Sequence, residues 1–444
     1  MDLQKKYPHY VKTKLAWAPE IPTDWHVRKL THAIGYTVGF TPESGNSIYY
    51  GDDFLWANIS DLGPRVLNET SKGITHEAVA KYRKWPTYAG SLLYSFKLSV
   101  GQVSFAGKDM FTNEAIASFS ESEWIHLPFF YYLAPLAIIQ NASENIYGAK
   151  ILNQEAIGNA KLIIPPKNEQ QAIARFLDFK TAQIDALIAK KKSLLDKLAE
   201  KRTALISHAV TKGLDPTVVM KNSGVNWLGD IPAHWDVKRL KFVGKTRYGL
   251  GEPPQKLDGG LPFIRATDIY RGEIDGSKVQ TVDPDYVPWS RNPNLKAKDI
   301  LVVRSGAYTG DSAIVPAIWE GSIAGYDMVY TTEGALPEYI AFNLLSKHVL
   351  NGQIYLAKNR AAQPHLNAEE LGNVVIALPP PEEQVEVVAY IEEETKRLAI
   401  QCDLVNSVVE RLLEYRSSMI TNAVTGKIDV RGFAIPQPPK GVAS

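Results

Sequence analysis

Several short motifs contain residue types that could do chemistry, but each lacks part of the required pattern. Residues 101–108 resemble a phosphate-binding loop, yet five residues rather than four separate the two glycines, and Asp109 follows the lysine. Gly249-Leu-Gly251 is followed by Glu-Pro-Pro, so no nucleotide-binding helix can begin there. Pro284-Asp285 lacks a nearby acidic partner and lysine for a nuclease metal site, and the nine histidines lack metal-ligand spacing. We expect neither a catalytic site nor a metal site.

The composition narrows the class of protein. The 444 residues suffice for two to four domains, and 45% apolar with 22% charged residues is typical of globular proteins. The 49 basic and 48 acidic side chains leave a net charge of +1, so the chain as a whole is not a polybasic binder. Cys402 is the single cysteine, which excludes a disulfide framework and fits a reducing compartment. With no apolar signal-peptide core and no stretch long enough to span a bilayer, we expect a cytoplasmic protein.

Matching segments indicate that the chain is a tandem duplication. Residues 20–30 read Glu-Ile-Pro-Thr-Asp-Trp-His-Val-Arg-Lys-Leu, and residues 230–240 read Asp-Ile-Pro-Ala-His-Trp-Asp-Val-Lys-Arg-Leu, an offset of 210. Further along, an offset of 214 carries Pro165-Pro-Lys-Asn-Glu-Gln170 onto Pro379-Pro-Pro-Glu-Glu-Gln384. The second copy has therefore gained a net four residues between these anchors. Trp25 and Trp235 occupy matching positions in residues 20–30 and 230–240. We expect both to be buried anchors where the chain enters each globular part.

Each copy combines a globular part with one long helix. The globular parts are rich in Gly, Pro, aromatic and β-branched residues, which is typical of short strands between turns. Residues 168–211 contain neither Gly nor Pro and predict a helix of about forty residues, on the order of 60 Å long at roughly 1.5 Å per residue. The fold class is α/β (α+β) with an internal pseudo-two-fold repeat. The expected boundaries are 1–164 and 214–378 for the globular parts, 165–213 and 379–427 for the helices, and 428–444 for a flexible tail.

Heptad spacing on both helices predicts that they form an antiparallel coiled coil. The apolar positions recur every seven residues, interrupted only by Lys191: Leu177, Ile184, Leu198, Leu205, Ile391, Leu398, Val405, Leu412 and Met419. Residues 167–212 carry ten basic and five acidic side chains, whereas residues 381–427 carry five basic and nine acidic ones. These opposite charges favour packing of the helices on each other. The alternative is two solvated helices that lie on separate domains.

The ordered motifs resemble the specificity subunit of type I restriction-modification enzymes. The resemblance rests on the Ile-Pro-x-x-Trp-x-Val-basic-basic-Leu entry, the Pro-Pro-x-x-Glu-Gln helix start, and Ala-Val-Thr with Gly-Lys-Ile-Asp429 after the helix. It covers residues 11–431, nearly the whole chain. Each motif is weak alone, but most of this ordered set occurs twice.

The resemblance implies a non-catalytic, DNA-reading function. The globular parts would be two target recognition domains, each of which reads one half of a split DNA sequence. The helices would space these domains and dock two methyltransferase subunits that use S-adenosylmethionine to methylate adenine N6. Two restriction subunits that hydrolyse ATP with Mg would complete the nuclease. No cofactor is expected in this chain, and the DNA target would be gapped and asymmetric because the two domains differ.

Base readout requires donors and acceptors on loops, typically Arg or Lys for guanine and Asn or Gln for adenine. In the first domain the candidates are Asn58, Ser60, Lys72, Lys81, Tyr82, Arg83 and Lys84, with Trp85 beside them. In the second domain they are Arg265, Thr267, Arg271, Lys278, Arg304, Tyr308, Lys358, Asn359, Arg360 and Gln363. The alternatives are a solvated strand edge with Trp85 in the core, an ion pair between Arg265 and Asp268, and an ordinary polar loop at 358–363.

Three other functions compete with this interpretation. The chain could serve a related enzyme whose partner fuses methylation and cleavage. It could also be a duplicated coiled-coil scaffold that binds other proteins, although its loops diverge where its anchors match. An autonomous adenine methyltransferase would need an Asn-Pro-Pro-Tyr-like element, which is absent from the sequence.

Overall fold

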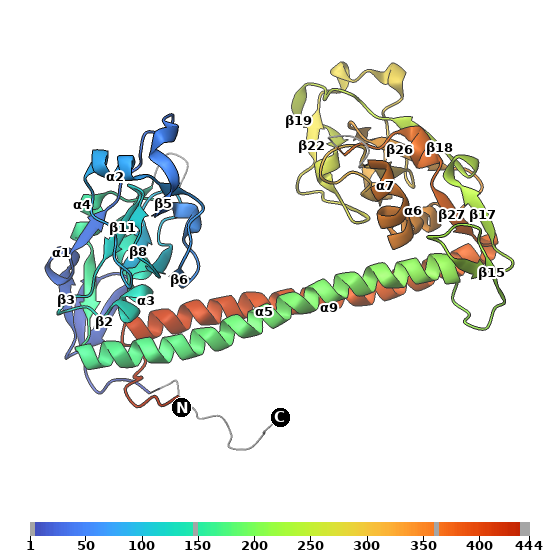
Figure 1. Cartoon of the computed structure of the whole chain (residues 1–444). Coiled ribbons are helices and arrows are strands. Elements are labelled where there is room, and N and C mark those ends of the chain that lie inside the picture. Colours follow the sequence, from blue (N-terminus) through green and yellow to red (C-terminus); the bar gives the residue numbers. More distant parts are fainter. Residues whose placement is uncertain (1–4, 145–149, 359–363, 436–444) are drawn as a thin grey trace. The chain divides into compact units, whose positions relative to one another are not determined.

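The computed structural model describes residues 5–144, 150–358 and 364–435. The chain divides into two compact units, one formed by residues 1–190 with 408–444 and the other by residues 191–407. Each unit contains one globular part and a portion of both long helices, α5 (Lys167–Lys212) and α9 (Pro381–Val424) (Figure 1). Within the described residues, no helix is both long and apolar enough to cross a membrane.

The first unit is built on two sheets. One has the strand order β4-β11-β8-β9-β6 and the other β10-β5-β7. The five strands of the larger sheet are β4 (Tyr36–Val38), β6 (Val66–Leu67), β8 (Leu92–Ser95), β9 (Val103–Ala106) and β11 (Ile116–Phe119). The smaller sheet contains β5 (Tyr50–Ala57), β7 (Gly73–Ile74) and β10 (Phe111–Thr112).

Paired strands and short helices complete the first unit. The pairs are β1 (Tyr10–Leu15) with β2 (Ala18–Pro22), β3 (His26–Lys29) with β14 (Lys161–Ile164), and β12 (Ser143–Glu144) with β13 (Lys150–Ile151). The α-helices are α1 (Leu30–Ala33), α2 (His76–Tyr82), α3 (Leu127–Ala137) and α4 (Gln154–Asn159). The 3-10 helices are η1 (Ser47–Tyr49), η2 (Ile59–Asp61) and η3 (Ile138–Asn141).

The second unit has a matching pair of sheets, with strand orders β18-β26-β23-β24 and β22-β19-β25. The first contains β18 (Gly244–Tyr248), β23 (Ile300–Val302), β24 (Ser312–Ile314) and β26 (Met328–Thr332). The second contains β19 (Lys256–Ile264), β22 (Gln280–Val282) and β25 (Ile323–Ala324). The pairs are β15 (Met220–Asn222) with β16 (Asp230–Pro232), β17 (Asp236–Arg239) with β27 (Val375–Leu378), and β20 (Ile269–Tyr270) with β21 (Glu273–Ile274).

Short helices connect the strands of the second unit. The α-helices are α6 (Pro337–Leu345), α7 (Tyr355–Lys358) and α8 (Ala368–Gly372), and η9 (His348–Ile354) is a π-helix. The 3-10 helices are η4 (Leu240–Phe242), η5 (Ala266–Asp268), η6 (Pro284–Tyr286), η7 (Trp289–Arg291) and η8 (Ala317–Trp319).

The strand pairings confirm the internal repeat. In each unit one long strand, β5 or β19, pairs in parallel with one neighbour and antiparallel with the other. Each of these strands then runs into a 3-10 helix, and the aspartate at its end accepts a hydrogen bond from the backbone N–H of the capping residue. That aspartate is Asp61 in η2 and Asp268 in η5. Residues 58–61, which read Asn-Ile-Ser-Asp, and residues 265–268, which read Arg-Ala-Thr-Asp, thus form the same local structure.

The predicted heptad seam is buried within each unit. In the first unit Leu177 and Ile184 of α5 share a core with Met419 of α9, and Leu412 packs against it. In the second unit Ile391 joins a core to which residues of both helices contribute, and Leu205 packs against it. Leu198 and Leu398 are buried as well, and Val405 is half-buried.

The two helices run antiparallel inside each unit. In the first unit the start of α5 lies with the end of α9, and in the second unit the end of α5 lies with the start of α9. One bidentate ion pair, from Arg416 to Asp185 at 2.8 and 3.2 Å, joins the helices in the first unit. The alternative of separate, solvated helices is therefore excluded, because apolar side chains bury the seam within each unit.

A tryptophan and a glutamate build the same junction in both units. The indole N–H of Trp25 donates to Glu169 at 2.9 Å, and that of Trp235 donates to Glu383 at 2.9 Å. Both tryptophans are buried, as the sequence predicts for entry anchors. The glutamate of each Pro-Pro-x-x-Glu-Gln motif therefore ties the first turn of a long helix to its globular part.

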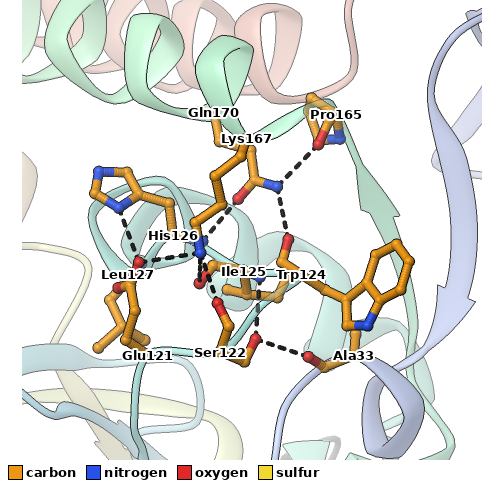
Figure 2. A network of polar contacts seen from close by, with 10 residues as sticks. All are labelled: Ala33, Glu121, Ser122, Trp124, Ile125, His126, Leu127, Pro165, Lys167 and Gln170. Atoms are coloured by element: carbon orange, nitrogen blue, oxygen red, sulfur yellow. Dashed lines mark hydrogen bonds and ion pairs between the residues drawn. The ribbon is translucent and has the colours of Figure 1, made fainter.

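The following glutamine fixes the direction of each helix. Gln170 accepts a hydrogen bond from the His126 backbone N–H at 2.8 Å, and its amide donates to the carbonyls of Trp124 and Pro165 at 2.8 and 2.9 Å (Figure 2). Figure 2 also shows Lys167 bound to the segment that precedes α3, through the carbonyls of Ser122 and Ile125. These contacts satisfy backbone groups around the buried start of α5.

Gln384 repeats the arrangement in the second unit. It accepts from the Leu336 N–H, immediately before α6, at 2.8 Å and donates to the Pro379 carbonyl at 2.9 Å. Since α3 and α6 occupy corresponding positions in the chain, one motif positions each recognition scaffold on its long helix.

The segment after α9 differs from the expected flexible tail at residues 428–433. Val430 is only 1% exposed, and the Asp429 backbone N–H donates to the Lys5 carbonyl at 2.8 Å. The ring of Phe433 contacts that of Phe176, with centroids 5.1 Å apart. Burial of apolar side chains in the first unit thus orders residues 428–433. The proline-rich sequence that follows them had suggested a flexible tail instead. Residues 436–444 lie outside the described residues, and the other domain boundaries stay predictions.

Candidate nucleic-acid interface

The basic cluster of the first domain lies at the end of α2. Thr75 caps the start of this helix by accepting from the Ala78 N–H. The helix ends at Arg83, whose backbone adopts the left-handed conformation with φ of 50°. Non-glycine residues rarely adopt this conformation, and it turns the chain sharply after α2. Arg83 and the next two residues are therefore displayed on a turn rather than along a strand edge.

Trp85 is 85% exposed, so the alternative that places its ring in the core is wrong. The neighbouring side chains of Arg83 and Lys84 are exposed, and among the described residues they have neither an ion-pair nor a hydrogen-bond partner. An exposed aromatic ring beside two unpaired cations offers both stacking and phosphate contacts. These three side chains are the most available of the first-domain candidates.

Lys81 and Tyr82 are held by contacts within the first domain. The Lys81 Nζ donates to the Tyr49 hydroxyl at 2.8 Å, and this bond raises the pKa of the lysine. The Tyr82 ring stacks on Phe40, and its hydroxyl accepts from the Glu43 N–H. Lys81 remains exposed, so its charge still contributes to the local positive potential.

Asn58 and Ser60 belong to the cap of η2. The Asn58 side chain accepts from the Ser60 N–H at 2.9 Å and donates to the Ser71 hydroxyl at 3.0 Å. Its amide is therefore occupied by local structure. Lys72 is exposed, and its backbone carbonyl accepts from the Trp56 N–H. The structure does not bring this group and the α2 cluster into one contact network.

Arg265 forms the ion pair that the sequence left open. Its guanidinium donates to both oxygens of Asp268 at 3.1 and 2.9 Å and to the Lys278 carbonyl at 2.9 Å. Thr267 also donates to Asp268, and Lys278 pairs with Asp275 at 2.9 Å. These contacts gather Arg265, Thr267 and Lys278 around η5. Lys278 is exposed, and the fork of Arg265 is already occupied.

Arg271 is at the tip of the hairpin between β20 and β21. Its φ is 44° and that of Gly272 is 99°, as in the two-residue turns that usually contain Asn-Gly. The guanidinium is 5.4 Å from the Tyr270 ring centroid, and the Arg271 carbonyl accepts from Arg202 of α5 at 3.2 Å. Arg271 therefore has an exposed side chain on a backbone whose conformation favours glycine. Such backbone strain costs free energy and is common at functional sites.

Arg304 and Tyr308 lie on the loop that follows β23. The Arg304 guanidinium lies 4.6 Å from the Tyr248 ring centroid and 4.4 Å from that of Tyr326. Both rings are partly exposed, as is Tyr308. Tyr248 and Tyr326 are not among the residues predicted from the sequence, because Tyr248 ends β18 and Tyr326 lies just before β26. Because Tyr248, Arg304 and Tyr326 are far apart in the sequence, no pattern of residue spacing indicates that they lie together.

Two ionisable side chains of the second domain are buried without full compensation. Desolvation raises the pKa of Asp327 to about 7. The Arg304 backbone N–H donates to Oδ1 of Asp327, and this hydrogen bond lowers the pKa by less than burial raises it. Desolvation also lowers the pKa of His348 to about 4, and neither of its ring nitrogens has a hydrogen-bond partner. At pH 7 the imidazole of His348 is therefore neutral, and the carboxyl group of Asp327 is about half protonated.

The last predicted cluster of the second domain is only partly visible. Lys358 ends α7, and Asn359, Arg360 and Gln363 lie outside the described residues. Elsewhere in the described chain, no group of three or more His, Cys, Asp or Glu side chains is arranged to hold a metal ion.

Comparison with known protein families gives one match that covers most of the chain. A family model described as the type I restriction modification DNA specificity domain matches residues 22–197 and again residues 232–408. The two matches coincide with the two structural repeats.

Individual relatives are distant. The specificity subunit of the type I restriction enzyme EcoBI of Escherichia coli is 27% identical over 68% of this chain, which spans about 65% of that relative. The MjaIX specificity subunit of Methanocaldococcus jannaschii is 23% identical over 81% of this chain and 84% of its own length. One solved structure, from work on assembly and conformational transition of the type I R-M system, has a TM-score of 0.66 at 15% identity. It covers 91% of this chain and 98% of its own, and it supports the fold.

Proposed function

Because this chain belongs to the family of type I restriction modification DNA specificity domains, we propose that it is the subunit that gives such an enzyme its DNA sequence specificity. The observation that carries the proposal is one scaffold built twice with different exposed loops. The Trp-Glu-Gln junctions, the sheets and the capped 3-10 helices repeat, whereas the α2 cluster and the Arg304 loop do not.

Such a design suits a split and asymmetric target. Each domain reads one half-site through its own loops, and the bases between the half-sites remain unread. The 46 residues of α5, about 70 Å at roughly 1.5 Å per residue, are long enough to separate two half-sites. The chain carries no chemistry of its own and uses no cofactor.

The partners are two methyltransferase subunits, which use S-adenosylmethionine to methylate adenine N6, and in the nuclease two restriction subunits that use ATP and Mg. Exposed apolar side chains on α9 support helix docking in the second unit, among them Val385, Tyr390, Ile400 and Leu404. Ile400 and Leu404 are four residues apart and so share one face of the helix. The complex acts on chromosomal DNA in the cytoplasm.

A map of N6-methyladenine in the host genome, with and without this chain, tests the proposal. We expect deletion to abolish methylation at one gapped, asymmetric motif. Exchange of residues 230–375 for the corresponding domain of a relative should then change one half of the motif and leave the other half intact.

The outcome that contradicts the proposal is equally clear. If deletion removes no methylated motif from a host that expresses the partner methyltransferase, the chain is a protein-interaction scaffold rather than a specificity subunit. Exchange of a segment of the N-terminal tail, such as residues 1–4, is the matched control and should leave the motif unchanged.

A further inference from the structure

Arg304 occupies a setting that is unusual among the arginines of the second domain. Its guanidinium carbon lies 4.6 and 4.4 Å from the ring centroids of Tyr248 and Tyr326. Contacts at these distances stabilise the cation by its attraction to the ring faces and restrict the rotamers of a long side chain. The head group is thus positioned by aromatic rings instead of by a carboxylate.

Backbone contacts brace the same residue. The Arg304 N–H donates to Asp327 Oδ1 at 3.4 Å, and the Arg304 carbonyl accepts from the Leu366 N–H at 2.8 Å. The Tyr248 hydroxyl accepts from the Ala368 N–H at 2.9 Å, which fixes that ring. A group whose backbone and stacking partner are both held loses little conformational entropy on binding a ligand.

The charge of Arg304 is nevertheless not neutralised. Within the described residues no carboxylate lies at ion-pair distance from its guanidinium, whereas Arg247 pairs with Asp299 at 2.9 Å and Arg265 with Asp268 at 2.9 Å. Residues 359–363, which lie outside the described residues, include no acidic residue in the sequence. The guanidinium Nη2 lies 3.4 Å from His365 Nε2.

Two buried polar atoms at this place lack a partner. The Nε of Arg304 is buried without a hydrogen bond, and so is Oδ2 of Asp327, a residue that is 1% exposed. Buried polar groups without partners are rare because each costs free energy, and they concentrate at functional sites. The described residues therefore leave one buried donor and one buried acceptor unpaired beside the guanidinium of Arg304.

The first domain has a buried phenylalanine at the position that corresponds to Arg304. In the hairpin β8–β9 the Gly101 N–H donates to the Ser95 carbonyl, and in β23–β24 the Gly310 N–H donates to the Val303 carbonyl. Both glycines have positive φ, 94° and 93°. Arg304 therefore stands at the position that Phe96, only 2% exposed, occupies in the first domain. The scaffold tolerates an ordinary core residue here, so stability does not require an arginine.

We propose that Arg304, positioned by Tyr248 and Tyr326, reads a guanine in the half-site of the second domain. This inference rests on the proposed DNA-reading function and deepens it. Guanine presents two acceptors, O6 and N7, on its major-groove edge, and the planar fork of arginine matches both. Stacking on the tyrosine rings holds that fork in place and itself uses none of its N–H groups, although Nη2 also contacts His365 Nε2 at 3.4 Å. Tyr248 and Tyr326 act as positioning residues.

The test uses the chain assembled with its methyltransferase subunits and a DNA library in which the second half-site is randomised. Sequencing of methylated products from the wild-type complex should reveal a position that requires guanine. Arg304→Lys, which keeps the charge but loses the fork, should relax that position alone, with a loss of about ten- to a hundredfold in discrimination. Arg239→Lys is the matched control, since Arg239 is exposed and distant in the chain from this loop.

Tyr326→Leu provides a second variant that leaves the guanidinium and its backbone contacts in place. It should relax the same position by a smaller factor, with the first half-site read as before. An unchanged motif in Arg304→Lys overturns the inference. A uniform loss across all sequences with a shallower salt dependence also overturns it, because that is the behaviour of a phosphate contact. If the wild-type complex itself shows no motif, the proposed function fails first.

Discussion

At the scale of single residues, His348 makes the second unit sensitive to acid. It is buried on the π-helix η9, and neither ring nitrogen has a partner. Burial lowers its pKa to about 4 from 6.5. The unfolded chain therefore binds a proton before the folded chain does as the pH falls, and folding stability is lost between about pH 6.5 and pH 4.

His348→Leu should remove this loss because leucine fills the site without titrating. We expect the free energy of unfolding of the variant, relative to wild type, to rise by roughly 2 kcal/mol between pH 7.5 and pH 5. Urea unfolding of the full chain at the two pH values measures it. Val349→Ala, a neighbouring buried change, is the control and should cost the same at both pH values. A relative stability of His348→Leu that does not change with pH would contradict the prediction.

The contribution of Asp327 to folding stability changes with pH in the direction opposite to that of His348. Its pKa is raised to about 7 from 3.8, so its contribution to stability is present at low pH and is lost as the pH rises through about 7. The wild-type pH profile combines both residues. Single variants are therefore needed to separate them, which is why the His348 prediction is stated as a difference.

At the scale of elements, the glutamine junctions connect each long helix to its globular part. Gln170 is fully buried and satisfies one backbone N–H and two backbone carbonyls (Figure 2). An exposed glutamine stands next to it at position 171. Substitution of both glutamines in turn therefore distinguishes the loss of the buried contacts from a change in helix propensity, which is the same at the two positions.

Gln170→Ala should destabilise the first unit by roughly 2–3 kcal/mol, because it leaves the His126 N–H and two carbonyls buried without partners. Gln171→Ala should change the free energy of unfolding by less than about 0.5 kcal/mol. Chemical denaturation of both variants provides the measurement. Equal effects from the two substitutions would show that the junction contributes nothing specific.

At the scale of the whole molecule, the near-neutral charge limits binding to DNA. A net charge of +1 supplies little counterion release, which drives nonspecific affinity for a duplex. The local cations at Arg83, Lys84 and Arg271 act over a short range. We therefore expect partner subunits to supply much of the affinity for DNA.

We expect the isolated chain to bind nonspecific duplex DNA weakly, with a shallow salt dependence, and the assembled complex to bind far more tightly. Fluorescence anisotropy with a labelled duplex at several salt concentrations measures both. A nanomolar, strongly salt-dependent complex of the isolated chain would refute this prediction. The duplex that contains the methylated motif serves as the positive control for the assembled complex.

The sequence by itself determined the duplication, the two long helices and their seam. These features are periodic or repeated along the chain, so residue spacing alone reports them, as Leu177, Ile184, Ile391 and Met419 illustrate. The entry tryptophans were predictable for the same reason. Their glutamate partners lie 144 and 148 residues away, however, so only the structure shows what holds them.

Only the tertiary structure decided which polar side chains are free to meet a ligand. Arg265 and Asn58 match the residue types that read bases, yet Asp268 and a helix cap occupy them. Trp85 could equally have been a core residue, and the stack of Tyr248, Arg304 and Tyr326 joins three separate segments. Availability depends on what long-range packing places beside a side chain, and that information is distributed over the whole fold rather than over neighbouring residues.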